Sequence, residues 1–243
     1  MIKTIKSVIK KTPLFKLYIT ISRFNAMSAR LDYLEKRVHN DNWDMMEKLM
    51  HYLVTAEIEG DYCEFGVFMG TTFNHALRYH GLFPHMRYFG FDSFEGLPAP
   101  EGIDNEGNYA SNFFKGQFSC SREQFIANIK ANNLPLEKVT LVKGWFDTSL
   151  TDDMAAQNNL KKIALAYIDC DFYHSTVPVL EFIGPRLSVG SIIAFDDWKT
   201  YRNLPDKGQQ LATAEWLARN PNIKLLPLLD YGPFGKVFSV AAI

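Results

Sequence analysis

The residues best suited to chemistry in this sequence are four aspartates that follow two apolar runs. Asp169 and Asp171 come after one run, and Asp196 and Asp197 come after the next. If the runs are adjacent parallel strands, their carboxyl ends meet at one edge of a sheet. Four carboxylates held together repel one another unless protons or a cation neutralise them, and oxygen ligands suit Mg²⁺, Mn²⁺ or Ca²⁺. The pattern predicts a divalent metal site; helix capping, the alternative, accounts for Asp171 better than for all four.

A glycine-containing turn follows the first β-rich run. Gly66 and Gly70 let the backbone approach a ligand closely, and the hydroxyls of Thr71 and Thr72 can cap a helix or bind that ligand. The turn lacks the G-x-G-x-x-G fingerprint of dinucleotide sites, which argues against a nicotinamide enzyme. Asp92 ends the next run, where an acid binds the ribose of a nucleoside in doubly wound folds. A surface-turn carboxylate is the alternative for Asp92.

Aromatic residues gather near these predicted strand ends. Gly144 follows the third run and leaves room for an adenine ring beside Trp145 and Phe146, which are equally consistent with ordinary core. Residues 93–121 are irregular and rich in Gly, Pro and Asn, as is typical of a binding loop or lid. Further aromatic residues in this loop and after the later runs offer surface for stacking a sugar or ring: Phe113, Phe114, Phe118, Tyr173, Trp198 and Tyr201.

The elements that position these residues alternate along the chain. Short β-rich runs are predicted at 62–67, 88–91, 139–142, 163–168, 191–195, 224–228 and 236–240. Helices are predicted between them at 72–79, 122–132, 151–158, 176–187 and 209–219. Strands and helices in alternation predict an α/β fold with a doubly wound, mostly parallel, seven-stranded sheet, whose last two strands close one edge.

The beginning of the chain differs from the rest in charge. Lysine and arginine are the only charged residues before Asp32. Residues 1–30 are typical of a basic amphipathic helix, interrupted by Pro13, that packs on its own domain or on a partner subunit; contact with an anionic membrane surface is the alternative. A second helix is predicted over 43–58. We therefore expect a helical extension at 1–59, which can serve a homodimer interface, and an α/β domain at 60–243.

Composition excludes several classes of protein. The chain has 243 residues, of which 47% are hydrophobic, which suits one sizeable core and excludes intrinsic disorder. A formal net charge of −1 gives no sign of a nucleic-acid partner. No apolar run reaches the roughly 18–20 residues of a membrane span, and no secretion signal is recognised. Cys63, Cys120 and Cys170 are scattered, which fits inert thiols in a reducing cytoplasm. The expected location is cytoplasmic, or peripheral at the inner membrane face.

Five segments together resemble the macrocin O-methyltransferase family. They are 64–67 (EFGV), 92–98 (DSFEGLP), 144–146 (GWF), 169–176 (DCDFYHST) and 196–198 (DDW). The two longest segments, in that order and followed by paired acids, are far more specific than a single glycine turn. The resemblance covers residue 60 to the end of the chain. It implies a Rossmann-like class I methyltransferase fold that uses S-adenosylmethionine and Mg²⁺ to methylate sugar hydroxyls of macrolides and aminocoumarins.

The resemblance also implies roles for individual residues. The methyl donor is surrounded by Glu64, Gly66, Thr71, Thr72, Asp92 and Ser93, with Asp92 on the ribose, and Gly144 and Trp145 complete the predicted donor pocket. Asp169, Asp196 and Asp197 match the family's metal ligands, and the same positions are similar to those that hold Mg²⁺ in catechol O-methyltransferase. Asp171 matches the acid assigned as general base in the sugar enzymes.

The sequence departs from the family pattern at two positions beside these acids. Cys170 stands where the family usually has glycine, and His174 stands where it usually has an acid. An imidazole is well matched to proton transfer near neutral pH. Asp171 and His174 are therefore both candidates for the base, and Asp171 is favoured.

The expected function is S-adenosylmethionine-dependent O-methylation, assisted by Mg²⁺ or Mn²⁺, of a hydroxyl on a sugar or glycoside. The acceptor is a natural product or a cell-surface glycan. Two alternatives are a catechol- or phenol-type O-methyltransferase and a catalytically silent protein that binds S-adenosylmethionine. A nucleic-acid methyltransferase is disfavoured by the neutral net charge and by the absence of an Asn/Asp-Pro-Pro-aromatic motif.

Overall fold

The computed structural model describes residues 41–108 and 113–243. The predicted basic segment 1–30 lies outside the described residues. Asn42–Ile243 forms one compact unit, and the boundary predicted at residue 60 lies inside it. The reason is the helix over 41–55, whose apolar face is buried in the core through Met45, Met46, Leu49, Met50 and Leu53. This helix belongs to the body of the domain.

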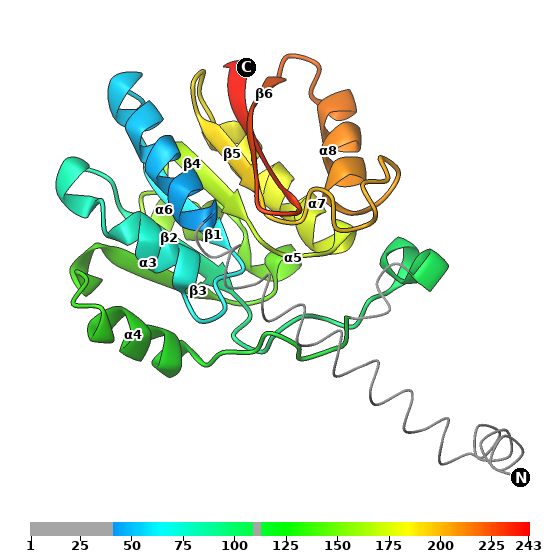
Figure 1. Ribbon diagram of the computed structural model, residues 1–243, viewed down its shortest axis with the longest axis horizontal. Helices are drawn as coiled ribbons and strands as arrows, with labels where there is room; N and C mark the ends of the chain where they lie inside the picture. Colours follow the sequence, from blue (N-terminus) through cyan, green and yellow to red (C-terminus); the bar gives the residue numbers. More distant parts are fainter. Residues whose placement is uncertain (1–40, 109–112) are drawn as a thin grey trace, which may run out of the picture. The chain divides into compact units, whose positions relative to one another are not determined.

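A seven-stranded sheet forms the middle layer, in the order β3-β2-β1-β4-β5-β7-β6 (Figure 1). The strands are β1 (Asp61–Phe65), β2 (Tyr88–Asp92), β3 (Val139–Lys143), β4 (Ile163–Ile168), β5 (Ile192–Phe195), β6 (Lys224–Tyr231) and β7 (Gly235–Ala242). The first five pair in parallel, and β7 runs antiparallel to both of its neighbours. The predicted doubly wound, mostly parallel sheet is therefore confirmed. Its winding reverses between β1 and β4, where such sheets bind ligands.

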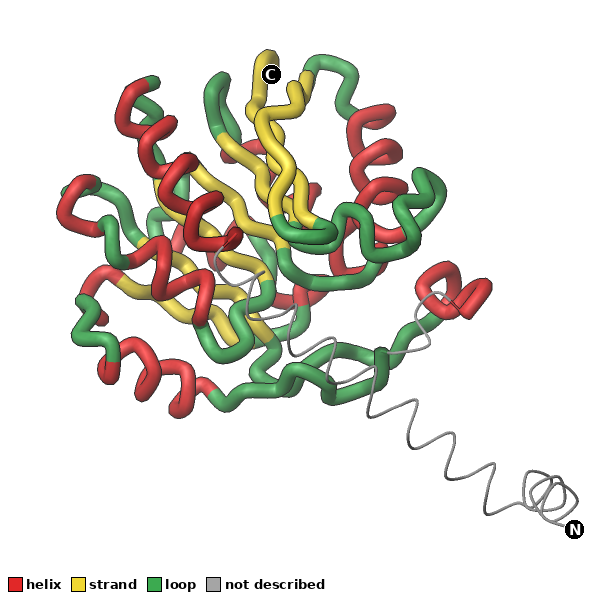
Figure 2. Tube along the Cα trace, in the orientation of Figure 1, coloured by secondary structure: helices red, strands yellow, loops and turns green. Residues whose placement is uncertain are grey.

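Helices cover both faces of the sheet (Figure 2). The helix over 41–55, α3 (Thr71–Leu77) and α4 (Arg122–Ala131) share one hydrophobic core with the sheet. On the other face lie α5 (Phe146–Ser149), α6 (Asp152–Gln157), α7 (Tyr173–Ile183) and α8 (Gly208–Arg219). The 3₁₀ turns are η1 (His80–Leu82), η2 (Gly102–Asn108), η3 (Leu136–Lys138) and η4 (Gly184–Arg186). The site described below lies at the carboxyl ends of the parallel strands, between these two helical layers.

The element boundaries differ from the predicted ones by a few residues. The helix α7 begins at Tyr173, earlier than the predicted 176, and gives way to the 3₁₀ turn η4 after Ile183. The strands β6 and β7 extend toward each other as far as Tyr231 and Gly235, because a turn at 232–234 joins them in a hairpin. Backbone pairing in that hairpin sets the strand length, which the hydrophobic pattern alone does not show.

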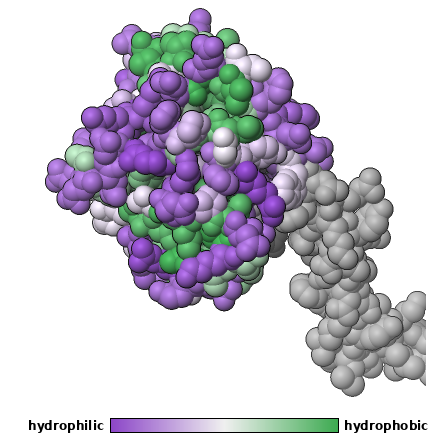
Figure 3. Space-filling model, turned by 90° about the vertical axis from the view of Figure 1, so that its left-hand side faces the viewer, coloured by the Kyte–Doolittle hydropathy of each residue, from purple (hydrophilic) through white to green (hydrophobic). Residues whose placement is uncertain are grey.

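The surface and the cysteines agree with the composition. The side of the molecule seen in Figure 3 is mainly hydrophilic, and its hydrophobic residues gather in separate areas. Within the described residues, no helix has both the length and the apolar character to cross a membrane. The three cysteines are free and buried, as expected of inert thiols.

Candidate functional site

Gly66 joins the glycine turn after β1 to the acidic segment after β4. Its φ of +87° lies in the left-handed region, and a Cβ at this position would lie 1.7 Å from the carbonyl oxygen of Asp169. Its amide donates to the carbonyl oxygen of Phe91 at 2.9 Å. Only glycine fits such a close approach of two backbones. The turn and the acidic segment are therefore packed directly against each other.

The Asp92 carboxylate fixes the shape of that turn. Its oxygens accept hydrogen bonds from the amides of Val67 at 2.8 Å, Phe68 at 3.4 Å and Phe94 at 2.6 Å. Burial raises the pKa of Asp92 above its usual range, and the three amide donors oppose that rise. The amide of Gly144 donates to the Asp92 carbonyl oxygen at 2.9 Å. Asp92 thus links the turn after β1 with the ends of β2 and β3.

Three carboxylates meet at the ends of β4 and β5. One oxygen from each of Asp169, Asp171 and Asp197 lies within 4.8 Å of the other two. The amide of Asp171 donates to Asp197 Oδ2 at 2.9 Å, which holds the two segments together. Asp171 has a φ of +58°, so its backbone turns sharply here. We name Asp169, Asp171 and Asp197 the acidic triad.

The structure places Asp196 differently from its neighbour Asp197. The hydroxyl of Tyr167 donates to Asp196 Oδ1, so this carboxylate points toward the tyrosine. Successive side chains along a strand point to opposite faces, and Asp196 and Asp197 continue β5 in this way. Two predicted metal ligands, Asp169 and Asp197, thus lie in the acidic triad, where Asp171 takes the third place. Asp196 is near enough to raise the pKa of Asp169.

Burial and mutual repulsion shift the acidic triad toward its protonated forms. Burial is the main cause of the raised pKa of Asp169 and of Asp171, and the neighbouring carboxylates add to it. Burial, followed by the charge of Asp196, raises the pKa of Asp197 to about 7. A divalent cation would neutralise these charges, so the donor set fits a hard metal ion.

The acidic triad should make stability depend on pH. The pKa of Asp197 is raised above its value of about 3.9 in an unfolded chain, so ionisation destabilises the folded state as pH rises from about 4 to about 7. In EDTA, the melting temperature of Asp197→Asn should rise relative to that of the unaltered chain as the pH increases from about 4 to about 7. Thermal unfolding followed by circular dichroism measures this difference. A difference that stays constant across the range would contradict the assignment.

The other predicted donor residues lie around the same turn. The Glu64 carboxylate is buried and accepts from the Tyr62 hydroxyl, and burial raises its pKa. Ser93 Oγ accepts from the Glu95 amide at 3.0 Å and donates to the Gly96 carbonyl oxygen at 3.1 Å, which builds the following turn. Trp145 is partly exposed, next to Gly144. The structure thus brings Gly66, Asp92 and Gly144 together and buries Glu64 in the core.

Two capping interpretations are wrong. The N-cap of α3 is Gly70, which has no side chain, so neither Thr71 nor Thr72 caps this helix. The N-cap of α7 is Phe172, which makes no side-chain capping bond, so Asp171 is not the cap. Asp171 is instead free to take part in the acidic triad.

The aromatic residues divide into core and surface. Trp198 is half-buried and packs against Phe195 and Phe238 of the core. Phe114 and Phe118 are exposed, and Phe118 contacts the Phe68 ring edge-on at 5.7 Å between centroids. The Phe118 ring of the loop therefore lies beside Phe68 of the glycine turn.

The chain matches a known protein family over most of its length. Residues 36–217, about three quarters of the chain, match the model of macrocin-O-methyltransferase (TylF). The chain belongs to the macrocin-O-methyltransferase family. The resemblance carried by the five sequence segments is confirmed, and the match extends into the helix over 41–55.

Two curated relatives come from Streptomyces. The 8-demethyl-8-(2,3-dimethoxy-alpha-L-rhamnosyl)-tetracenomycin-C 4'-O-methyltransferase of Streptomyces olivaceus is 30% identical over 64% of this chain. Demethyldecarbamoylnovobiocin O-methyltransferase of Streptomyces niveus is 27% identical over 60% of it. The matched region spans 59% and 55% of the length of these relatives.

Solved structures confirm the fold. The O-methyltransferase NovP superposes with a TM-score of 0.67 and 21% identity, covering 83% of this chain and 80% of its own. The calicheamicin methyltransferase CalS11 gives a TM-score of 0.66 and 24% identity, covering 98% of this chain and 90% of its own. The macrocin-O-methyltransferase family member described here therefore has the Rossmann-like class I methyltransferase fold expected from its sequence.

Proposed function

We propose that this chain is an S-adenosylmethionine-dependent O-methyltransferase that acts on a hydroxyl of a sugar or glycoside. The observation that carries the proposal is the contact of Gly66 with Asp169, which packs the glycine turn against the acidic triad. A turn that binds the donor thereby lies beside carboxylates that bind a hydroxylated acceptor. Membership of the macrocin-O-methyltransferase family and the rhamnosyl substrate in the name of one relative support the same reaction.

The donor pocket is proposed at the switch between β1 and β4. The turn amides that Asp92 holds in place, together with Gly66 and Gly144, offer backbone close to a nucleoside ligand. Trp145 offers a partly exposed ring for the adenine. The acidic triad adjoins the same turn through the contact of Gly66 with Asp169, so a donor bound here would lie beside the triad.

The acidic triad is proposed to hold Mg²⁺ or Mn²⁺. The triad offers three carboxylate oxygens that lie within 4.8 Å of one another. Burial, and after it repulsion between the carboxylates, raises the pKa of each carboxyl, and a divalent cation would relieve that repulsion. When bound, a divalent cation lowers the pKa of an acceptor hydroxyl and fixes its position. The protein contributes orientation, a water-poor surface and a group that accepts the hydroxyl proton.

Replacing Asp92 by asparagine should weaken binding of the methyl donor. The asparagine side chain lacks the negative charge of the carboxylate to which three backbone N–H groups now donate. Hydrogen bonds to a charged group of this kind contribute about 1.5–3 kcal/mol. We expect affinity for S-adenosylmethionine to fall by about 10- to 100-fold. Calorimetric titration measures the change. The exposed Asp153→Asn is the control, and equal affinities of Asp92→Asn and Asp153→Asn would refute the role given to Asp92.

An acceptor screen tests the reaction itself. Release of S-adenosylhomocysteine is measured with rhamnosyl glycosides, other deoxysugar glycosides and catechols, each with Mg²⁺ and with EDTA. Turnover of a glycoside that EDTA abolishes supports the proposal. Turnover of catechols alone would indicate a phenol-type methyltransferase, and donor binding without turnover of any acceptor would indicate a silent binding protein.

A further inference from the structure

The first turn of α7 is capped by a residue far away in the sequence. Phe172, at the N-cap, has no polar side chain, and Asp104 of η2 takes over that function. Asp104 Oδ1 accepts from the Tyr173 amide at 2.8 Å, and Oδ2 accepts from the His174 amide at 3.1 Å, across 69 and 70 positions of sequence. A carboxylate is favourable at a helix N-terminus because amide donors and the helix dipole both attract it.

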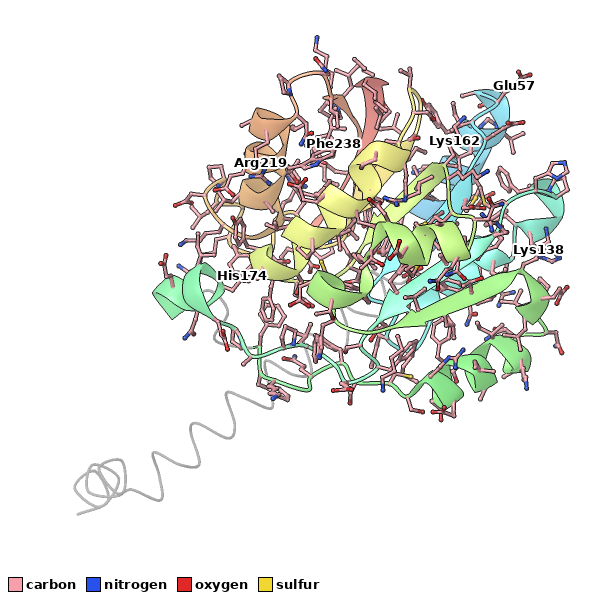
Figure 4. The ribbon with its side chains drawn as sticks, turned by 180° about the vertical axis from the view of Figure 1, so that it is seen from behind. Glu57, Lys138, Lys162, His174, Arg219 and Phe238 are labelled. Atoms are coloured by element: carbon pink, nitrogen blue, oxygen red, sulfur yellow. The ribbon has the colours of Figure 1, made fainter. Side chains whose placement is uncertain are left out.

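The same carboxylate holds the side chain of His174. His174 Nδ1 lies 2.7 Å from Asp104 Oδ2. An ionised carboxylate can only accept a hydrogen bond, so in the neutral ring Nδ1 carries the proton and donates it to that bond. Nε2 then keeps its lone pair. The imidazole is 58% exposed, whereas Asp104 is 2% exposed, so the pair presents a solvent-facing base on a buried anion. Figure 4 shows His174 at the start of α7 beside η2.

Asp104 also ties the long loop to the body of the domain. The Tyr201 hydroxyl donates to Asp104 Oδ1 at 3.3 Å. Glu106, two residues after Asp104, forms an ion pair with Lys207 at 2.6 Å. At the base of the loop, Leu97 and Gln117 pair through their backbones. The loop that leaves the donor side therefore docks on α7 and on the segment after β5, next to the acidic triad.

His174 lies outside the acidic triad but on the same segment. Asp171 contributes an oxygen to the triad, so a cation bound there would occupy the carboxylate that is favoured as base. His174 follows three residues later. Its ring is held by the Asp104 carboxylate. The backbone of Gly102 passes its ring edge, since a Cβ there would lie 3.2 Å from Cε1. Of the two candidate bases, His174 is the one outside the acidic triad, and Asp104 orients its ring.

Resting on the proposed function, we propose that Asp104 is a positioning residue that fixes His174 with Nε2 ready to accept the acceptor's proton. The acceptor O–H proton passes to Nε2 while the acceptor oxygen bonds to the methyl carbon. The carbon–sulfur bond breaks, its electron pair stays on sulfur as S-adenosylhomocysteine, and Asp104 stabilises the imidazolium. Asp104 thereby joins η2, the start of α7 and the His174 ring through one carboxylate.

The tautomer of His174 tests the positioning role without any acceptor. Long-range proton–nitrogen correlation spectra of the full chain, at a pH where the ring is neutral, distinguish Nδ1–H from Nε2–H, and His174→Gln identifies the signals. We expect Nδ1–H for His174, although free histidine favours Nε2–H. An Nε2–H ring would overturn the proposal. If Asp104→Asn fails to fold, this measurement on the unaltered chain still decides.

A double-mutant cycle tests the catalytic consequence with the glycoside found in the acceptor screen. His174→Gln should lower kcat by about 100-fold, with KM for the donor unchanged. Asp104→Asn should lower kcat by about 10- to 100-fold, and the double variant should be no slower than His174→Gln. Glu101→Gln, an exposed acid of the same loop, is the control and should keep kcat within about threefold. Independent, multiplying effects of the two substitutions would refute the coupling, and absence of turnover in the unaltered chain would refute the proposed function instead.

Discussion

Replacing Asp197 by asparagine is expected to abolish nearly all turnover, lowering kcat by about 100- to 1000-fold at saturating Mg²⁺. The substitution removes the negative charge and one ligand oxygen of a triad carboxylate and leaves only a neutral oxygen to accept from the Asp171 amide. Binding of S-adenosylmethionine should remain within about threefold, because the donor turn is held by Asp92 instead. Steady-state kinetics and titration of the donor separate the two effects. Turnover equal to that of the control Asp153→Asn would contradict the account.

Asp196→Asn is the matched comparison for the metal site. Asp196 accepts from Tyr167 and lies outside the acidic triad, whereas Asp197 lies within it. If Asp169, Asp171 and Asp197 bind the cation, the affinity for Mg²⁺ should fall more in Asp197→Asn than in Asp196→Asn. Calorimetric titration of Mg²⁺ measures both. The reverse order would restore Asp196 to the ligand set that the family resemblance implies.

Gly66→Ala is expected to destabilise the fold by about 3 kcal/mol or more. The added Cβ would overlap the carbonyl oxygen of Asp169, and the φ of +87° is unfavourable for alanine. The clash involves backbone on both sides, so neither strand end can yield without separating β1 from β4. Urea unfolding of the purified protein measures the loss.

Gly81→Ala is the control for that substitution. A Cβ at Gly81 would meet nothing within 4 Å, so we expect stability within about 0.5 kcal/mol of the unaltered chain. Equal stabilities of Gly66→Ala and Gly81→Ala would mean that the glycine turn and the acidic segment are not packed as described.

The sequence predicts the inner strands of the sheet well because β1, β4 and β5 are buried on both faces. The residues of β4 are all fully buried, so its predicted limits, 163–168, agree with the structure. The same burial places Asp169 and Asp197 at adjacent strand ends, as two continuous apolar runs ended by acids indicate. Hydrophobic runs and the residues that end them therefore predict which side chains meet at the edge.

What the sequence does not show depends on contacts between distant residues. Asp104 lies in an irregular loop, and nothing near it in the chain marks it as the cap of α7; the apolar Phe172 at that N-cap is the only local signal that a cap must come from elsewhere. The orientation of Asp196 was open to prediction, since side chains alternate along a strand. Its partner Tyr167, on the neighbouring strand, requires the register to be known.

Titration of S-adenosylmethionine into the full chain tests the central claim most directly. Calorimetry with Mg²⁺ and with EDTA, repeated with S-adenosylhomocysteine, should show saturable binding at one site per chain, weakened in Asp92→Asn and retained in Asp197→Asn. Absence of binding under both conditions by a folded protein would contradict the account, because the glycine turn would then hold no methyl donor and the acidic triad would belong to a different chemistry.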